Sequence, residues 1–453
     1  MVNNLPWPLV SFETLLTEPL RNGIYKKKEF HGRGCKIVNM GELFKYPRLN
    51  SDVEMNLVEL SDKEKEKSLL QTGDLIFARR SLTAEGAGKC TLIYKISEDT
   101  TFESSIIRAR LDPNKALPEF YYYLFNSPIG KWLLGTILRQ TAVAGITGSD
   151  LAKLMVPCPP ISLQKELVEH ARVLDNKIDI NNQLNQTLEQ MAQTLFKSWF
   201  VDFDPVKAKM NGEQPKGMET AITALFPEKL VESELGLIPE GWEVKSVGEF
   251  TDTFDYVANG SFAALKANVE LYDEPNDVLY VRTTDFNKGF KNDLKYTDQS
   301  SYQFLAKSKL YGHETIISNV GDVGTVFRAP SWYEMPMTLG SNAMGIVSEG
   351  ANSYIYYLFK SHIGQHLLDG ITSGSAQMKF NKTSFRKLRV VLPSNDLLAK
   401  FEELEGSLWA KHASNQKESL YLEKLRDTLL PKLISGEVRL DSPEVEQAKA
   451  LVD

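Results

Sequence analysis

Residues Leu163–Phe200 read LQKELVEHARVLDNKIDINNQLNQTLEQMAQTLFKSWF, and this stretch decides the fold. It contains neither glycine nor proline, and its apolar residues recur at helical spacing, so it predicts one long α-helix. Two seven-residue rows run along it, which are Leu167, Leu174, Asn181, Leu188 and Leu195, and Ala171, Ile178, Asn185, Ala192 and Trp199. Together they make a narrow apolar seam, which favours pairing with another helix over burial in a broad core.

The partner helix lies in the same chain, because the sequence carries an internal duplication. Tyr123-Leu124-Phe125 recurs 234 residues later as Tyr357-Leu358-Phe359. The same offset holds without a gap for Ile129-Gly130, Leu133-Leu134, Leu154, Pro159, Leu163, Asn181, Leu188-Glu189 and Thr194-Leu195. Chance similarity between two amphipathic helices does not explain a register that also holds through the non-helical residues 154–159. Residues Leu397–Ile434 therefore predict the second long helix.

Composition sets the broad class of protein. The chain has 453 residues, of which 42% are hydrophobic and 25% charged, as expected for a globular protein of two or three domains. Its net charge of −7 argues against a large basic face that binds nucleic acid unaided. The three cysteines lie far apart, which indicates a reducing compartment. With neither a signal peptide nor a long apolar run in the sequence, we expect a cytoplasmic protein that does not bind membranes.

Each copy places a mixed α/β domain before its long helix. The expected segments are a first domain at 1–160, a helix at 161–200, a connector at 201–240, a second domain at 241–394, a helix at 395–436 and an acidic, frayed tail at 437–453. Within the first domain, PEFYYYLFNSPIGKWLLGTIL (residues 118–138) predicts one aromatic helix. Its rings are interpreted as core rather than as a surface on which bases stack.

Catalytic and metal-binding interpretations are weak. Residues 85–90, EGAGKC, lack the first glycine and the Ser or Thr of a phosphate loop. His362 and His366 lack the intervening pattern of a zinc protease, and Asp202 and Asp204 lie in a connector rich in turn formers. The sequence also lacks the tetrapeptide and the glycine-rich fingerprint that an amino-methyltransferase needs. We therefore expect no catalytic residue, no metal site and no cofactor in this chain.

Polar loops offer a different chemistry, because Arg, Lys, Asn, Gln, Ser and Thr are the residues that read base edges. The loops that follow the two aromatic helices occupy equivalent positions but differ in content, as expected for two readers of different sequences. The candidates for DNA contact are Arg79, Arg80, Lys89, Arg139, Gln140 and Thr141 in the first copy, and Arg282, Asn319, Arg328, Ser373, Ser375, Gln377, Lys379 and Asn381 in the second.

Four stretches resemble the specificity subunit of type I restriction–modification systems. They are SLQKELVEHARVLDNKI (162–178), QTLFKSWFVDFDPVKAKMNG (193–212), ELGLIPEGWEV (234–244) and KLRDTLLPKLISGEV (424–438). The resemblance implies an α+β fold, with two duplicated mixed α/β target-recognition domains separated by two long helices that form an antiparallel coiled coil. If the helices run antiparallel, their midpoints meet, and Asn181 and Asn415 are predicted to pair and to fix the register.

The resemblance also implies a function. Each domain would read one half of a split, asymmetric site in double-stranded DNA, and the helices would set the gap. Two modification (methyltransferase) subunits would supply S-adenosylmethionine chemistry, and two restriction (motor-nuclease) subunits would use ATP and Mg²⁺. The chain itself would be a non-catalytic recognition subunit. Two alternatives remain open from the residues, namely a coiled-coil scaffold that binds proteins and a self-contained DNA enzyme.

Overall fold

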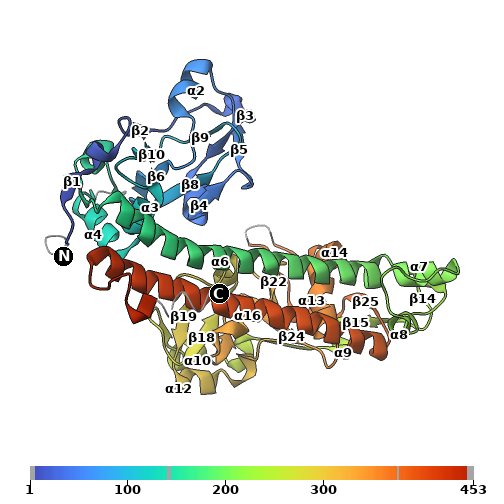
Figure 1. Ribbon diagram of the computed structural model, residues 1–453. Coiled ribbons are helices and arrows are strands. Elements are labelled where there is room, and N and C mark those ends of the chain that lie inside the picture. The colour runs from blue at the N-terminus through green and yellow to red at the C-terminus, as the bar shows by residue number, and fades with distance from the viewer. Residues whose placement is uncertain (1–5, 140–143, 375–376, 446–453) are drawn as a thin grey trace. The chain divides into compact units, whose positions relative to one another are not determined.

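The computed structural model describes residues 6–139, 144–374 and 377–445, and the chain divides into two compact units. The first unit comprises Met1–Asp179 and Leu420–Asp453, and the second comprises Ile180–Ser419. Two long helices, α6 (Ile161–Phe196) and α16 (Asn395–Ser435), each contribute residues to both units (Figure 1). Each unit therefore holds one mixed α/β domain and a part of both helices.

The first unit is built on a five-stranded sheet in the order β2-β10-β6-β8-β4, with a three-stranded sheet β5-β3-β9 beside it. Its strands are β1 (Leu9–Ser11), β2 (Arg21–Asn22), β3 (His31–Val38), β4 (Arg48–Asn50), β5 (Asn56–Val58), β6 (Leu75–Ala78), β7 (Arg80–Ser81), β8 (Cys90–Lys95), β9 (Thr100–Phe102), β10 (Ile106–Ala109), β11 (Ala144–Gly145) and β12 (Met155–Pro157). Its short helices are α1 (Met40–Lys45), α2 (Asp62–Ser68), α3 (Pro118–Asn126), α4 (Pro128–Thr136) and α5 (Gly148–Ala152).

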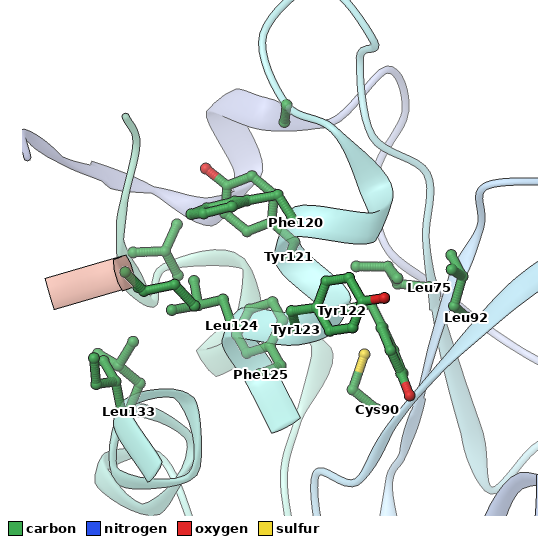
Figure 2. Close-up of a cluster of buried hydrophobic side chains, with 14 of the residues drawn as sticks. Leu75, Cys90, Leu92, Phe120, Tyr121, Tyr122, Tyr123, Leu124, Phe125 and Leu133 are labelled. Atoms are coloured by element: carbon green, nitrogen blue, oxygen red, sulfur yellow. The ribbon is translucent and has the colours of Figure 1, made fainter. Parts of the chain in front are cut away.

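The core of this unit forms where α3 packs on the sheet. Residues 120–125 of α3 are all buried, and a short helix that is apolar on every side belongs inside a domain. Figure 2 shows these aromatic side chains together with Leu75, Cys90 and Leu92 of the sheet. The same cluster includes Leu167 and Ala171 of α6 and Leu429, Leu430, Leu433 and Ile434 of α16, so the domain contacts both helices through apolar side chains. The interpretation of the aromatic rings as core is confirmed.

The predicted single helix at 118–138 is wrong, because the chain breaks between α3 and α4. The Ser127 hydroxyl accepts a hydrogen bond from the Gly130 amide (3.2 Å) and so begins a new helix, which Pro128 at its first position favours. The second copy breaks at the equivalent Ser361, whose hydroxyl accepts from the Gly364 amide (3.3 Å) although no proline follows. The serine cap is therefore the common cause of the break.

The second unit repeats the plan with a four-stranded sheet, β16-β24-β21-β22, and a five-stranded sheet, β17-β19-β18-β23-β20. Its strands are β13 (Leu230–Ser233), β14 (Gly236–Pro239), β15 (Glu243–Ser246), β16 (Asp252–Asp255), β17 (Leu271–Tyr272), β18 (Val278–Val281), β19 (Lys295–Thr297), β20 (Lys309–Leu310), β21 (Thr315–Ser318), β22 (Val326–Phe327), β23 (Met337–Leu339), β24 (Ala343–Val347) and β25 (Arg389–Leu392). Its helices are α7 (Asp204–Met210), α8 (Thr220–Thr223), α9 (Val247–Phe250), α10 (Phe262–Asn268), α11 (Thr283–Asn287), α12 (Gln299–Phe304), α13 (Asn352–Lys360), α14 (His362–Ile371) and α15 (Lys382–Arg386).

The ends of the long helices differ from the expectation in two places. α6 stops at Phe196 and continues as one π-helical turn, Lys197–Val201, which buries Trp199 and Phe200 in the second unit. The tail beyond α16 is not frayed throughout its described part, because Val445 is buried against the core of the first unit. Apolar burial explains both departures, since each turn places a large side chain out of water.

The two helices pair antiparallel in both units, as the resemblance implies. In the first unit Asp175 bonds to Arg426 and Ile178 packs with Leu422, and in the second Asn181 bonds to Glu418 and Asn185 to Asn415. Residues of increasing number on α6 thus contact residues of decreasing number on α16, so the two helices run antiparallel.

The predicted contact between Asn181 and Asn415 is wrong by about one helical turn. Asn415 Nδ2 donates to Asn185 Oδ1 (2.8 Å), and Asn181 Nδ2 donates to Glu418 Oε2 (2.7 Å). The prediction assumed that the midpoints of the two helices meet. The axial register is instead determined by the side-chain contacts along the seam.

Candidate nucleic-acid interface

In the first unit, candidate residues meet at the carboxyl end of β6. Arg79 and Arg80 follow this strand directly, and Arg80 pairs with Gly145 in the short ladder of β7 and β11. The backbones of Arg139 and Gly145 exchange two hydrogen bonds (2.9 and 3.1 Å), and the Ile146 amide donates to the Arg79 carbonyl (3.0 Å). The loop after α4 is thereby held against the residues that follow β6.

The second unit builds the same arrangement from different side chains. Asn319 follows β21, and the Phe380 amide donates to its carbonyl (3.2 Å). The backbones of Ser373 and Lys379 exchange two hydrogen bonds of 2.9 Å, and Val320 bridges to Lys379. Ser373 and Lys379 are the positions that the 234-residue offset assigns to Arg139 and Gly145. The duplication therefore preserves the backbone of this edge and varies its side chains.

Several candidates at these edges present free polar groups to solvent. Arg80, Ser373, Gln377 and Lys379 are exposed, while Arg79 and Asn319 are half-buried. Arg139 is exposed but paired with the Asp150 carboxylate at 2.8 Å. Gln140, Thr141 and Ser375 lie outside the described residues. We call Arg79, Arg80 and Arg139 the reading edge of the first unit, and Asn319, Ser373, Gln377 and Lys379 the reading edge of the second.

Two further candidates, Lys89 and Arg282, have partners of their own, although the Lys89 carbonyl accepts a hydrogen bond from the Ala78 amide (2.9 Å) at the carboxyl end of β6. Lys89 Nζ donates to the Phe44 carbonyl (2.8 Å), and burial, helped by Lys131, lowers the pKa of this lysine. Arg282 binds the buried Asp285 carboxylate, and this hydrogen-bonded pair raises the pKa of the guanidinium. Its hydrogen bonds hold the start of α11 in place.

Arg328 is a structural residue, which contradicts its prediction as a DNA contact. Its guanidinium is 5% exposed, pairs with the Glu405 carboxylate at 2.8 Å and lies over the rings of Tyr356 and Trp409. Burial opposes its charge, but Glu405 outweighs that effect and raises the pKa of Arg328. No local sequence pattern indicates this role, because the partner lies 77 residues away on α16.

Asn381 also has a structural role. Its side-chain oxygen accepts a hydrogen bond from the Ser384 amide (2.9 Å) and caps α15. The 234-residue offset pairs it with Thr147, which caps α5 through the Asp150 amide (3.1 Å). Because both copies keep a capping residue here, Asn381 belongs to the repeated framework rather than to the variable reading groups.

The sequence-based reasoning missed a basic stretch at the same end of the first sheet. Residues 25–28 read YKKK, and Tyr25, Lys27 and Lys28 are exposed. The lysine run was a visible signal, but only the strand register places it near Arg79.

Other chemistry is sparse in the described part of the chain. Residues 6–139, 144–374 and 377–445 contain no group of three or more His, Cys, Asp or Glu side chains arranged to hold a metal ion. His362 and His366 are exposed on α14, and Asp202 and Asp204 bond to Lys197 and Ser198 of the neighbouring turn. Within the same ranges, no helix is long and apolar enough to cross a membrane.

Two copies of one α/β domain, each with a polar edge and each seated on a shared helix pair, define a duplicated recognition protein. Residues 22–190 and 239–396 match the family described as "Type I restriction modification DNA specificity domain". The chain therefore belongs to this family.

Two curated relatives match nearly end to end. The HindI type I restriction enzyme specificity subunit of Haemophilus influenzae is 26% identical over 449 residues, which cover 89% of this chain and 94% of that protein. The MjaIX specificity subunit of Methanocaldococcus jannaschii is 25% identical and covers 92% of this chain and 89% of its own. A crystal structure of the type I restriction–modification S subunit from M. genitalium aligns with a TM-score of 0.49 at 15% identity, covering 95% of this chain and 96% of that one.

Proposed function

We propose that this chain is the DNA sequence-specificity subunit of a type I restriction–modification complex. Each unit reads one half of a bipartite, asymmetric site in double-stranded DNA, and the α6–α16 pair sets the unread gap between the halves. The chain supplies recognition alone, and S-adenosylmethionine, ATP and Mg²⁺ act in its partner subunits.

One observation carries the proposal, namely that the duplication keeps the backbone of the reading edge and changes its side chains. The first edge offers arginines, whose bidentate donors suit guanine O6 and N7. The second offers Asn319 and Gln377, whose amides suit adenine N6 and N7, beside Lys379. A scaffold that binds the same protein twice would keep both surfaces alike, so divergence at fixed geometry favours two different half-sites.

The helix pair also supports a place for partner subunits. Besides the seam that faces α16, the part of α6 in the second unit carries another apolar row, with Ile180 57% and Met191 52% exposed and Leu184 half-buried between them. These residues recur at spacings of seven and four, as on a helix that packs against a further helix. We assign this row to the modification subunits, two per chain, and the motor-nuclease subunits join through them.

Sequencing the methylome of a host that carries this gene with its modification partner tests the proposal. We expect one methylated motif made of two unrelated half-sites separated by a fixed number of unread bases. Exchange of residues 8–155 for the corresponding domain of a relative should change one half-site and leave the other intact. A motif in which both halves change together, or the absence of any new methylation, would contradict the proposal.

A further inference from the structure

The strand register brings two segments of the first unit to one end of its sheet, namely the residues that follow β2 and those that follow β6. β10 pairs antiparallel with β6 through Ile106 and Ala78, and with β2 through Ile107 and Asn22. The carboxyl ends of β2 and β6 therefore lie at the same end. The Gly23 amide donates to the Ile106 carbonyl (3.1 Å), and the Arg79 amide donates to the neighbouring Ser105 carbonyl (2.8 Å).

The most exposed apolar side chains of the first unit lie in these segments. Leu82 is 93% exposed and follows β7, while Tyr25 is 82% exposed and follows β2. Single exposed apolar residues are common on protein surfaces, but two that share one sheet end with a reading edge form a pattern. Lys27 and Lys28 are exposed beside Tyr25, and their ammonium groups have no ion-pair partner among the described residues.

The second unit repeats the pattern independently. β24 pairs with β16 through Met344 and Asp255, and with β21 through Ala343 and Ser318, so both strands end beside Asn319. Phe262, in the segment that follows β16, is 79% exposed, and it is the most exposed large apolar side chain described in this unit. Tyr311, which is 70% exposed, precedes β21 and so lies toward the other end of that strand.

We propose that Tyr25 and Leu82 in the first unit and Phe262 in the second are apolar contacts to the bases of duplex DNA, and that Lys27 and Lys28 bind adjacent phosphates. The inference rests on the proposed function and extends it to residues that the polar reading edges do not include. Apolar side chains distinguish bases by covering the thymine methyl group or by entering a flexible base step. Lysine at a phosphate adds affinity for any sequence.

The lysines are tested by binding of the full chain, with its modification partner, to a labelled duplex of random sequence. Lys27→Ala/Lys28→Ala should lower the affinity roughly tenfold and reduce the log–log salt slope by about two. The matched control is Lys95→Ala/Lys115→Ala, which removes two exposed lysines at the other end of the same sheet, because β8 ends at Lys95, Lys115 follows β10, and both strands run antiparallel to β6; it should leave binding at the wild-type level. Equal binding by the two double variants would overturn the assignment of the lysines.

The apolar residues are tested with a duplex that carries the methylated motif. Phe262→Ala should weaken binding to this duplex between about fivefold and a hundredfold, leave random duplex unaffected and relax one half-site in the methylome. Tyr311→Ala is the matched control and should change neither measurement. Tyr25→Ala/Leu82→Ala should relax the other half-site.

If these variants bind the motif duplex with wild-type affinity and methylate only the wild-type motif, the proposed apolar contacts are refuted. If instead the wild-type complex binds neither duplex, the proposed function fails and this inference fails with it.

Discussion

Asn415 Nδ2 donates a hydrogen bond to Asn185 Oδ1 at 2.8 Å, and both side chains are buried between α6 and α16. Asn185 Nδ2 in turn donates to the His412 carbonyl (3.3 Å). A buried amide is stable only where its groups are bonded, so sliding one helix by a heptad would leave both asparagines without these partners. The pair therefore fixes the helix register at the expense of some apolar packing.

The first prediction concerns this pair. Asn415→Leu should destabilise the second unit by about 1–3 kcal/mol, because it leaves the Asn185 amide buried without its donor. Asn185→Leu/Asn415→Leu should recover or exceed wild-type stability, since two apolar side chains replace two bonded amides. Amide hydrogen exchange along α6 and α16 measures both effects. Additive effects of the two single changes would show that the asparagines do not interact.

The second prediction concerns the buried Arg328–Glu405 ion pair. Arg328→Met should destabilise the second unit by about 3–5 kcal/mol, because Glu405 would keep a buried charge without its cation. Ser353 Oγ and the Tyr357 hydroxyl still donate to Glu405 (2.6 and 3.4 Å), but two neutral hydroxyls do not replace a guanidinium. Arg328→Met/Glu405→Leu should restore most of the loss, as thermal denaturation will show. A double variant as unstable as the single one would mean that the cost comes from the lost cation–π packing.

The third prediction concerns pH. The His412 ring stacks on Trp409 with centroids 4.9 Å apart. Burial lowers the pKa of His412, with Glu189 opposing the shift and Lys360 and Arg328 adding to it. The folded side chain thus stays neutral while the unfolded one takes up a proton below about pH 6.5, so the contribution of His412 is complete above that pH and is lost below it.

We therefore expect the melting temperature of wild type to fall more between pH 7.5 and 5.5 than that of His412→Phe. His362→Gln is the control, because this histidine is exposed on α14 and should leave the wild-type slope unchanged. Parallel slopes for wild type and His412→Phe would contradict the assignment.

The fourth prediction concerns the repeated helix break. A Cβ atom at Gly130 would lie 2.0 Å from the Leu124 carbonyl oxygen, and one at Gly364 would lie 2.1 Å from that of Leu358. Gly130→Ala and Gly364→Ala should each open the turn and markedly lower the melting temperature. Gly135→Ala is the matched control on α4, where a Cβ atom meets nothing within 4 Å, and it should be neutral or stabilising. Equal melting temperatures for Gly130→Ala and Gly135→Ala would refute the steric argument.

The sequence predicted the architecture well because the duplication gave two independent samples of each element. The long helices and the aromatic core helices follow from apolar periodicity, which the structure confirms. Periodicity carries no information on side-chain caps, so the break at Ser127 was missed. It also fixes a helix face but not its axial position, which is why Asn181 was matched to Asn415 one turn away from the observed contact.

The candidate site was predicted only in part, for a related reason. Arg79, Arg80 and Arg139 were named as separate candidates, and only the pairing of β7 with β11 and the bonds around it bring them together. Arg328 was misassigned because a polar residue after a strand looks the same in sequence whether it faces water or a buried carboxylate. Tyr25 was missed because its proximity to Arg79 depends on the pairing of β2 with β10, which no local pattern encodes.

The last prediction concerns the α6–α16 pair as the element that sets the gap between the two half-sites. The chain passes between its two units at residues 179–180 of α6 and 419–420 of α16. Inserting four helix-forming residues at both points keeps every contact within each unit, because the α6 part and the α16 part of each unit are displaced together. Four residues add about 6 Å to each helix, which lies between one and two base-pair steps of about 3.4 Å. Four residues also rotate each helix by about 40° beyond one full turn, which is close to the helical twist between two neighbouring base pairs. The methylome of the doubly lengthened variant should therefore show both half-sites unchanged and the gap longer by one or two bases. A single insertion in α6 is the control, and it should reduce methylation because the two parts of α6 can no longer both keep their register with α16. Full activity with an unchanged gap in the double insertion would show that this helix pair does not set the distance.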